Sequence, residues 1–193
     1  MDYILASHNS WSYLRPKKWW MRLLRFTARC QRYDIGTQFI MYDVRGFDLR
    51  VRFDSSATPI FTHGIIEYEY SLDDMLEELQ RLNIPGTYIR VILEVRNKKS
   101  YTSFQVECFK EFCAYLIARF PFIKFWGGSN LYNHNVDFEF ECKPTCEEKY
   151  ASVCKPRLID DWWPWLFAWH NNHAIRQEGT DKGILMIDFV NIK

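Results

Sequence analysis

Predicted strands alternate with helical segments along most of this chain, and this alternation limits the folds that it can adopt. The strands are expected at residues 3–6, 44–53, 60–64, 88–96, 123–126, 136–141 and 183–190. Apolar spacing and capping signals predict helices at residues 15–26, 72–82, 102–120 and 160–177, the last broken at Pro164. Strands that alternate with helices typically form one sheet with right-handed crossovers. The sequence therefore predicts an α/β fold on a parallel, barrel-like sheet.

The length and charge of the chain limit the number of domains and the kinds of partner that we expect. Its 193 residues can bury a substantial core and favour a single domain over residues 1–193. The formal net charge is +1, so no overall field indicates nucleic acid as a partner. No stretch is long and apolar enough to cross a bilayer, and no signal peptide is visible. A secreted and a membrane-peripheral location both stay open.

Aromatic residues make up 18% of the chain, and tryptophans cluster at Trp19-Trp20, Trp162-Trp163 and Trp165. Clustered tryptophans are usually buried, so we expect them in the core, with a lipid interface as the alternative. The basic segment 15–26 carries Trp20, Leu23 and Leu24 on one face. We expect it to form a surface helix, and contact with an anionic membrane is the alternative.

The six cysteines fall into two groups and one single residue, Cys30. Cys108 and Cys113 lie in the predicted helix 102–120 and are expected to pack as small apolar residues. A second group could form a disulfide, a metal site with His134, or reduced thiols, and consists of Cys142, Cys146 and Cys154. Its spacing matches no zinc pattern well, so reduced thiols are favoured over a disulfide, and both over zinc.

Histidines stand where two of the predicted strands end. His8 breaks the apolar run 3–6, and His63 closes the strand 60–64. Side chains at the carboxyl ends of parallel strands point into the crevice where α/β folds place their chemistry. A lone histidine there is more often structural. Two histidines in similar settings, with an arginine-rich strand between them, suit phosphoryl transfer.

Charged residues also occur within two of the strands. Period two places Asp48 and Arg50 on one face of the strand 44–53, opposite an apolar face. In a barrel-like sheet these two side chains would line the interior near its top. Asp188 interrupts the apolar strand 183–190, where an unpartnered carboxylate is costly to bury. It is therefore either a satisfied structural group or the orienting partner of a catalytic base.

Three segments together resemble the catalytic half of the phosphatidylinositol-specific phospholipase C family. They are Ser7-His8-Asn9-Ser10, Arg45-Gly46-Phe47-Asp48-Leu49-Arg50 and Phe61-Thr62-His63-Gly64. The resemblance covers roughly residues 3–97, extends to 183–190 and leaves 127–180 unplaced. It implies a small or distorted TIM (β/α) barrel with fewer helices than eight full repeats. The implied reaction, on phospholipid at a membrane surface, is attack of the inositol 2-hydroxyl on phosphorus, which yields diacylglycerol and a cyclic inositol phosphate.

The resemblance also implies roles for individual residues. His8 would be the general base and His63 the general acid, because histidine titrates near neutrality. Asp188 would hold His8 in the reactive tautomer, and Arg50 would stabilise the charge on the phosphate oxygens. The expected substrate-binding residues are Asn9, Asp48 and Arg96. A solvated strand end explains Arg96 equally well.

Arg50 stands where calcium-dependent members of the family have a carboxylate. The chain therefore resembles the metal-independent bacterial members, and no metal cofactor is expected. Asn9 departs from that group, which usually has aspartate there, so Asp48 is expected to hold Arg50 instead. Calcium is the alternative cofactor, but Asn9 with a lone Asp48 is a poor cage for a hard cation. Alternative functions are a phospho-headgroup binding protein without turnover and a phosphodiesterase for another lipid headgroup.

Overall fold

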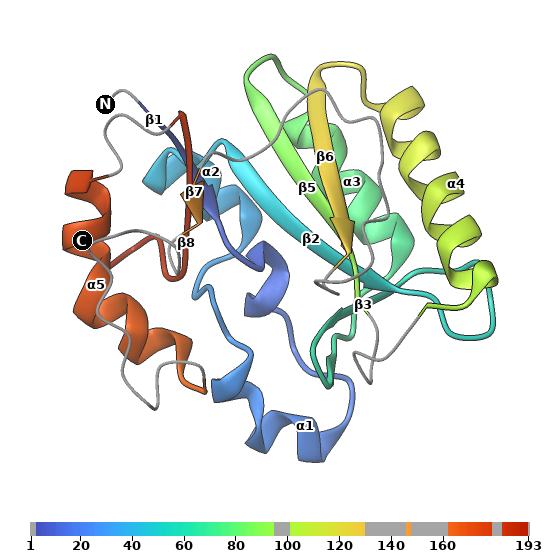
Figure 1. Cartoon of the computed structure of the whole chain (residues 1–193), viewed down its shortest axis with the longest axis horizontal. Helices are drawn as coiled ribbons and strands as arrows, with labels where there is room; N and C mark the ends of the chain where they lie inside the picture. The colour runs from blue at the N-terminus through green and yellow to red at the C-terminus, as the bar shows by residue number, and fades with distance from the viewer. Residues whose placement is uncertain (1–2, 95–100, 130–145, 148–161, 179–182, 193) are drawn as a thin grey trace.

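An eight-stranded sheet forms the centre of the protein (Figure 1). The computed structural model describes residues 3–94, 101–129, 146–147, 162–178 and 183–192. The strands are β1 (Tyr3–Ser7), β2 (Gly46–Arg52), β3 (Ile60–His63), β4 (Ile66–Glu67), β5 (Thr87–Leu93), β6 (Ile123–Ser129), β7 (Cys146–Glu147) and β8 (Gly183–Ile187). The helices are α1 (Trp19–Leu23), α2 (Ile35–Tyr42), α3 (Leu72–Leu82), α4 (Ser103–Arg119) and α5 (Pro164–Glu178), and the 3-10 turns are η1 (Ser10–Tyr13) and η2 (Arg25–Thr27).

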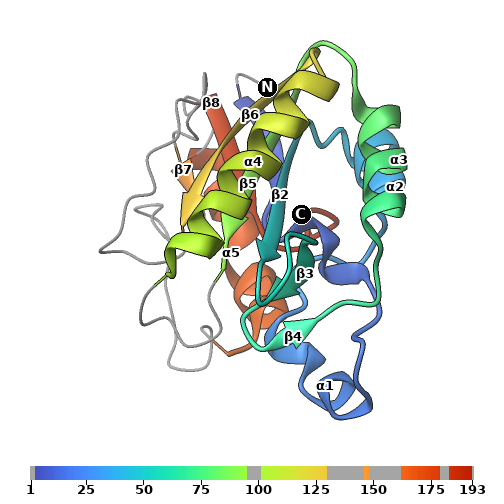
Figure 2. The same ribbon diagram turned by 90° about the vertical axis from the view of Figure 1, so that its right-hand side faces the viewer.

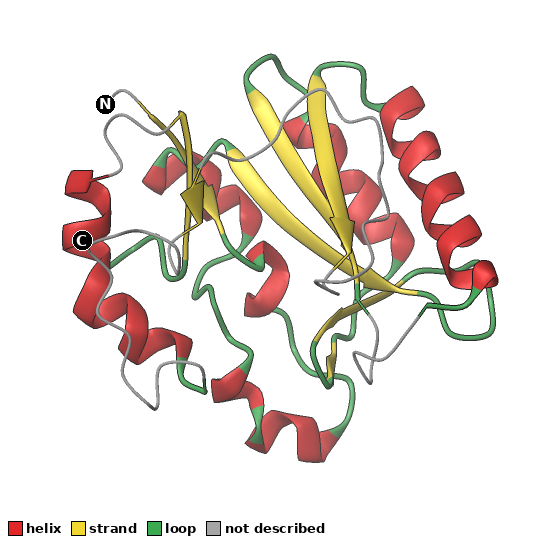
Figure 3. Ribbon diagram, viewed as in Figure 1, coloured by secondary structure: helices red, strands yellow, loops and turns green. Residues whose placement is uncertain are grey.

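Parallel pairing runs through most of the sheet, in the order β7-β8-β1-β2-β5-β6. β3 pairs antiparallel with the carboxyl end of β2, and β4 pairs with β3. Within the described residues the sheet does not close, because β6 and β7 each pair with a single neighbour (Figure 3). The predicted α/β class is therefore confirmed, and the open sheet is consistent with a distorted barrel.

The orientation of β3 differs from the parallel arrangement that the sequence suggested. Only residues 53–59 join β2 to β3. A parallel crossover needs about a dozen residues or more, whereas an antiparallel return needs only a short turn. The connection therefore folds β3 back against Val51 and Arg52, and this turn brings His63 toward the carboxyl end of the parallel strands.

Capped helices flank the sheet, and Figure 2 shows α4 alongside β5 and β6. Reciprocal capping boxes start α3 at Ser71 and Asp74 and start α4 at Thr102 and Gln105. The predicted apolar stripe of α3 faces the core, where its buried residues are Met75, Leu79 and Leu82. α5 lies at the other end of the sheet, against β8 (Figure 1).

The charged face of β2 is turned inward. Asp48 and Arg52 are buried, and only 11% of the Arg50 side chain is exposed. β1 and β2 approach closely because Gly46 faces Ala6, where a Cβ on the glycine would lie 2.5 Å from the Ala6 Cβ. The close approach places the residues that follow β1 beside Asp48.

Two predicted helices differ in extent from those in the structure. α5 begins at Pro164, the position at which the helix predicted over 160–177 was expected to break. Proline is favoured at the first helical position, because the amide hydrogen that it lacks has no partner there anyway. The segment 15–26 forms only the short α1 and the 3-10 turn η2, so it is not one continuous amphipathic helix.

Several clustered tryptophans are on the surface, contrary to the expectation that they form part of the core. Trp19 and Trp162 are 72% and 70% exposed, and Trp163 and Trp165 are 43% and 42% exposed. They lie on α1 and at the start of α5, where Phe26 contacts Trp163 with ring centroids 6.1 Å apart. The turn η2 contacts both α1 and α5, and these contacts leave the tryptophan side chains exposed. None of the helices in the described ranges is long and apolar enough to span a bilayer.

The structure describes the side chains of three of the six cysteines. Cys108 and Cys113 are buried free thiols in the core, as expected, and Cys30 is also buried. The strand predicted at 136–141 lies outside the described residues. So do Cys142, Cys154 and the side chain of Cys146.

Candidate active site

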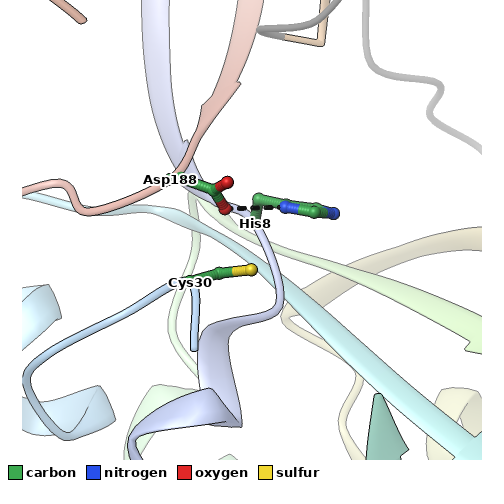
Figure 4. Close-up of side chains that lie close together, drawn as sticks. All are labelled: His8, Cys30 and Asp188. Atoms are coloured by element: carbon green, nitrogen blue, oxygen red, sulfur yellow. Dashed lines mark hydrogen bonds and ion pairs between the residues drawn. The ribbon is translucent and has the colours of Figure 1, made fainter. Parts of the chain in front are cut away.

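Neighbouring parallel strands bring His8 and Asp188 together. β1 and β8 pair in register from Tyr3 to Ser7, and the His8 amide donates to the Ile187 carbonyl over 2.9 Å. The next residue on each strand is therefore at the same level. His8 Nδ1 lies 2.7 Å from Asp188 Oδ1, and the close-up in Figure 4 shows this pair. Asp188 is buried, whereas 17% of the His8 side chain is exposed. The pair therefore extends from the protein interior to its surface.

Both residues of this pair are followed by a residue in the left-handed backbone region. Asn9 has φ 43° and Phe189 has φ 45°. Such angles cost energy for residues other than glycine and occur preferentially at functional sites. The turns are held by hydrogen bonds, because the Asn9 amide donates to Asp48 Oδ2 over 2.9 Å and the Phe189 amide donates to the Cys30 carbonyl over 2.6 Å. The chain thus bends sharply after His8 and after Asp188.

Arg50 lies on the other side of the His8 ring. Its Nη2 is 2.5 Å from His8 Nε2, its Nε donates to Asp48 Oδ2 over 2.8 Å, and its Nη1 donates to Glu94 Oε1 over 3.0 Å. Burial alone would lower the pKa of Arg50, but Asp48 and Glu94 raise it above its ordinary value. The guanidinium is therefore a fixed cation between two carboxylates.

Both carboxylates are buried and ionised. Burial would raise the pKa of Asp48, but Arg50, Arg90 and His8 hold it well below its usual range. Burial would likewise raise the pKa of Glu94, but His63 and Arg50 lower it to about 2. Two negative charges therefore surround Arg50 at neutral pH.

His63 stands across the site from His8. The two imidazole centroids are 6.1 Å apart and the rings are nearly perpendicular, at 89°. His63 Nδ1 is 3.3 Å from Glu94 Oε1, which is an ion-pair distance without the alignment of a hydrogen bond. Glu94 Oε2 also accepts from the Gly64 amide over 2.7 Å and so holds the turn after His63. Burial lowers the pKa of His63, and the nearby Glu94 offsets part of this effect.

The structure brings most of the predicted site residues into one cluster: His8, Asp48, Arg50, His63 and Asp188. Asn9 is different. Its side chain is buried and donates to the Ala28 carbonyl over 3.1 Å, so Asn9 offers the site its backbone amide and not its side-chain amide. Arg96 lies outside the described residues.

Two charged residues of the site were not predicted. Glu94 follows β5, and its amide donates to the Val51 carbonyl of β2 over 2.8 Å, next to Arg50. Arg90 faces Asp48 in the β2–β5 register, with its Nε 3.8 Å from Asp48 Oδ1. Glu94 is a polar residue that follows an apolar run in the sequence, and the same pattern singled out His8.

One group in the described part of the chain has the donor types for a metal ion: His8, Cys30 and Asp188. Arg50 already lies between Asp48 and Glu94 and pairs with both carboxylates. A calcium ion takes six to eight oxygen ligands, which this pair could help to supply only if Arg50 moved away. The residues of the cluster therefore do not fit a calcium site as they are arranged.

Comparison with known proteins gives structural neighbours only. No protein-family model and no curated sequence matches the chain. The phosphatidylinositol-specific phospholipase C from Listeria monocytogenes matches with a TM-score of 0.62 and 14% identity, over 96% of this chain and 87% of that one. A mutant of the Staphylococcus aureus enzyme matches with a TM-score of 0.61 and 15% identity, over 97% of this chain and 85% of that one. The chain therefore shares the distorted-barrel α/β fold of the bacterial phosphatidylinositol-specific phospholipases C.

Proposed function

We propose that the protein is a phosphodiesterase of the phosphatidylinositol-specific phospholipase C type. It would cleave inositol phospholipid and release diacylglycerol and a cyclic inositol phosphate. The observation that carries this proposal is the chain of contacts Asp188–His8–Arg50, with His63 on the opposite side of the cluster. Phosphodiester transfer needs a base, an acid and a fixed cation, and this arrangement offers one of each.

His8 is the proposed general base. Asp188 Oδ1 accepts a hydrogen bond from a protonated His8 Nδ1, which leaves the lone pair on Nε2. In the free protein Arg50 Nη2 lies against that nitrogen. In the proposed complex the inositol 2-hydroxyl takes this position, and Nε2 removes its proton as the oxygen attacks phosphorus. Arg50 then turns its donors to the phosphate oxygens, where two parallel hydrogen bonds match the guanidinium geometry.

His63 is the proposed general acid. Its proton passes to the glycerol oxygen as the bond from that oxygen to phosphorus breaks. Glu94 beside Nδ1 favours the protonated ring, whereas burial and Arg50 oppose it. The net result is a pKa below that of an ordinary histidine, so the protonated His63 ring readily gives up its proton.

The proposed reaction uses no metal cofactor. Arg50 supplies the positive charge for the transition state, and Asp48 and Glu94 hold it in place through its Nε and Nη1 atoms. Fixed charges that need no reorganisation during the reaction are usually the largest contribution to such catalysis. Chelators should therefore leave the rate unchanged.

The proposed substrate is a phospholipid in a membrane surface. The exposed aromatic residues Phe26 of η2 and Trp163 and Trp165 at the start of α5 line a cavity of about 240 Å³, together with Arg25, Arg29 and Phe189. Phe189 directly follows Asp188, so the cavity borders the candidate active site. Indole rings favour the headgroup region of a bilayer, and arginines are attracted to anionic lipids. This surface supports the membrane-interface alternative for the tryptophans.

The test is hydrolysis of phosphatidylinositol in detergent-mixed micelles by the wild type and three variants. His8→Ala and His63→Ala should each lose at least about 10²-fold in rate, because each removes a proton-transfer group. His173→Ala, an exposed histidine of α5, is the matched control and should keep the wild-type rate. Headgroup binding without any product from the wild type would favour a binding protein and refute the proposal.

A further inference from the structure

The proposed reaction does not use Cys30, although this residue lies beside the proposed base. Cys30 is 1% exposed and lies in the loop between η2 and α2, where its Sγ is 3.8 Å from the Ala28 carbonyl oxygen and 3.9 Å from Asn9 Nδ2. Figure 4 shows its side chain pointing toward the His8–Asp188 pair. One ligand atom from each of His8, Cys30 and Asp188 lies within 4.8 Å of the other two. Three elements far apart in the chain thus bring an imidazole, a thiol and a carboxylate together.

This donor set has the chemistry of a zinc site. Zinc binds imidazole nitrogen at about 2.0–2.1 Å, thiolate sulfur at about 2.3 Å and carboxylate oxygen at about 2.0–2.2 Å, in tetrahedral geometry. Those bond lengths place the donors about 3.3–3.6 Å from one another. Here His8 Nδ1 and Asp188 Oδ1 are 2.7 Å apart, and no pair in the group exceeds 4.8 Å. Side-chain shifts of about 1 Å would therefore complete three of the four zinc positions.

We propose that His8, Cys30 and Asp188 bind a thiophilic divalent cation such as Zn²⁺, and that this binding switches the candidate active site off. The ion replaces the Nδ1 proton between His8 and Asp188 and the proton of the Cys30 thiol, and both protons pass to solvent. The fourth position is left for water on the exposed side of His8. A thiol donor selects zinc-like ions over calcium and magnesium, which prefer oxygen.

The inhibition follows from the atoms that the ion would occupy. Asp188 would coordinate the ion and would no longer accept from His8 Nδ1, so the His8 ring would be held by the metal. Its orientation toward the 2-hydroxyl and Arg50 would then change. This half of the inference rests on the proposed phosphodiesterase function, whereas metal binding itself does not.

Metal binding can be tested with Co²⁺ as a spectroscopic probe and Zn²⁺ as its competitor. The wild type should bind one equivalent and show the near-ultraviolet band of a cobalt–thiolate bond. Cys30→Ala should lose this band and bind at least about tenfold more weakly, because a metal ligand is removed. Cys108→Ala, which removes a different buried thiol, is the matched control and should behave as the wild type. Retention of the band and the affinity in Cys30→Ala would overturn the proposal.

The switch can be tested on hydrolysis of phosphatidylinositol. Zn²⁺ should inhibit the wild type and the Cys108→Ala variant, and a chelator should restore their activity. Cys30→Ala should keep the basal rate and need at least about tenfold more Zn²⁺ for the same inhibition. Equal inhibition of both variants would refute the switch. Cys30→Ser serves in place of Cys30→Ala if thermal unfolding shows that the alanine variant does not fold.

These two measurements also separate this inference from the proposed function. A wild type that binds Co²⁺ through Cys30 but hydrolyses no phosphodiester would support the metal site and refute the phosphodiesterase. A wild type that hydrolyses phosphatidylinositol but shows no cobalt–thiolate band would support the phosphodiesterase and refute the metal site.

Discussion

Glu94 links the two halves of the candidate site, so its replacement by glutamine is a direct test of the electrostatic argument. Glu94→Gln keeps the shape of the side chain and can still accept the Gly64 amide. It removes the charge that faces Arg50 at 3.0 Å and His63 at 3.3 Å. Breaking a buried ion pair on one side typically costs about 3–5 kcal/mol.

The magnitude can also be worked from the pKa of Glu94. A carboxyl group whose pKa falls from 4.5 to about 2 on folding stabilises the folded state by about 3 kcal/mol at pH 7. Because the folded pKa is the lower one, this stabilisation is complete well above pH 4.5 and is lost as the pH falls toward 2. At pH 3 about 1.5 kcal/mol of it would be left.

The assay is urea unfolding of the wild type and Glu94→Gln at pH 7 and pH 3. The variant should be less stable by about 3 kcal/mol at pH 7, and the difference should shrink by about half at pH 3. Glu77→Gln is the control, because Glu77 is 74% exposed and 3.8 Å from Arg81, and such surface pairs contribute little. A Glu94→Gln difference that is absent at pH 7, or equal at both pH values, would refute this reasoning.

Three further predictions test other parts of the molecule. Asp188→Asn should lower kcat of phosphatidylinositol hydrolysis by about 10³–10⁴-fold with little change in KM, because His8 would lose its orienting partner. Steady-state kinetics measures this effect, and an unchanged kcat would contradict the prediction. Gly46→Ala should lower the free energy of unfolding by about 1–3 kcal/mol, because its Cβ would lie 2.5 Å from that of Ala6; an unchanged urea midpoint would exclude this packing argument. Trp163→Ala should weaken binding to anionic vesicles in a sedimentation assay, whereas Tyr115→Ala, equally exposed at 43%, should not; equal effects would argue against an interface at α1 and α5.

Local patterns predicted the fold class and much of the cluster. The two histidines and Asp188 stand at or near the ends of apolar runs, and period two put Asp48 and Arg50 on one face of a strand. Each of these inferences needs only a few neighbouring residues. Their convergence follows because the carboxyl ends of neighbouring parallel strands meet at one edge of a sheet.

The features that the sequence did not predict depend on contacts between distant segments. Glu94 reaches Arg50 only because β2 and β5 pair in a particular register, which a single strand does not encode. The side chain of Asn9 turns to Ala28 because its own backbone is left-handed, and that angle depends on the Asp48 carboxylate. The exposure of Trp19 and Trp163 reflects how short elements pack at the edge of the fold, whereas residue statistics favour burial.

The central claim is that the two histidines and Arg50 catalyse phosphodiester transfer without a metal ion. The most direct measurement is phosphorus NMR of phosphatidylinositol micelles incubated with the protein in the presence of a chelator. The account predicts that the wild type produces a cyclic inositol phosphate signal, and that His8→Ala and His63→Ala produce none over the same time. Absence of the cyclic product from the wild type, or its undiminished formation by either variant, would contradict the account.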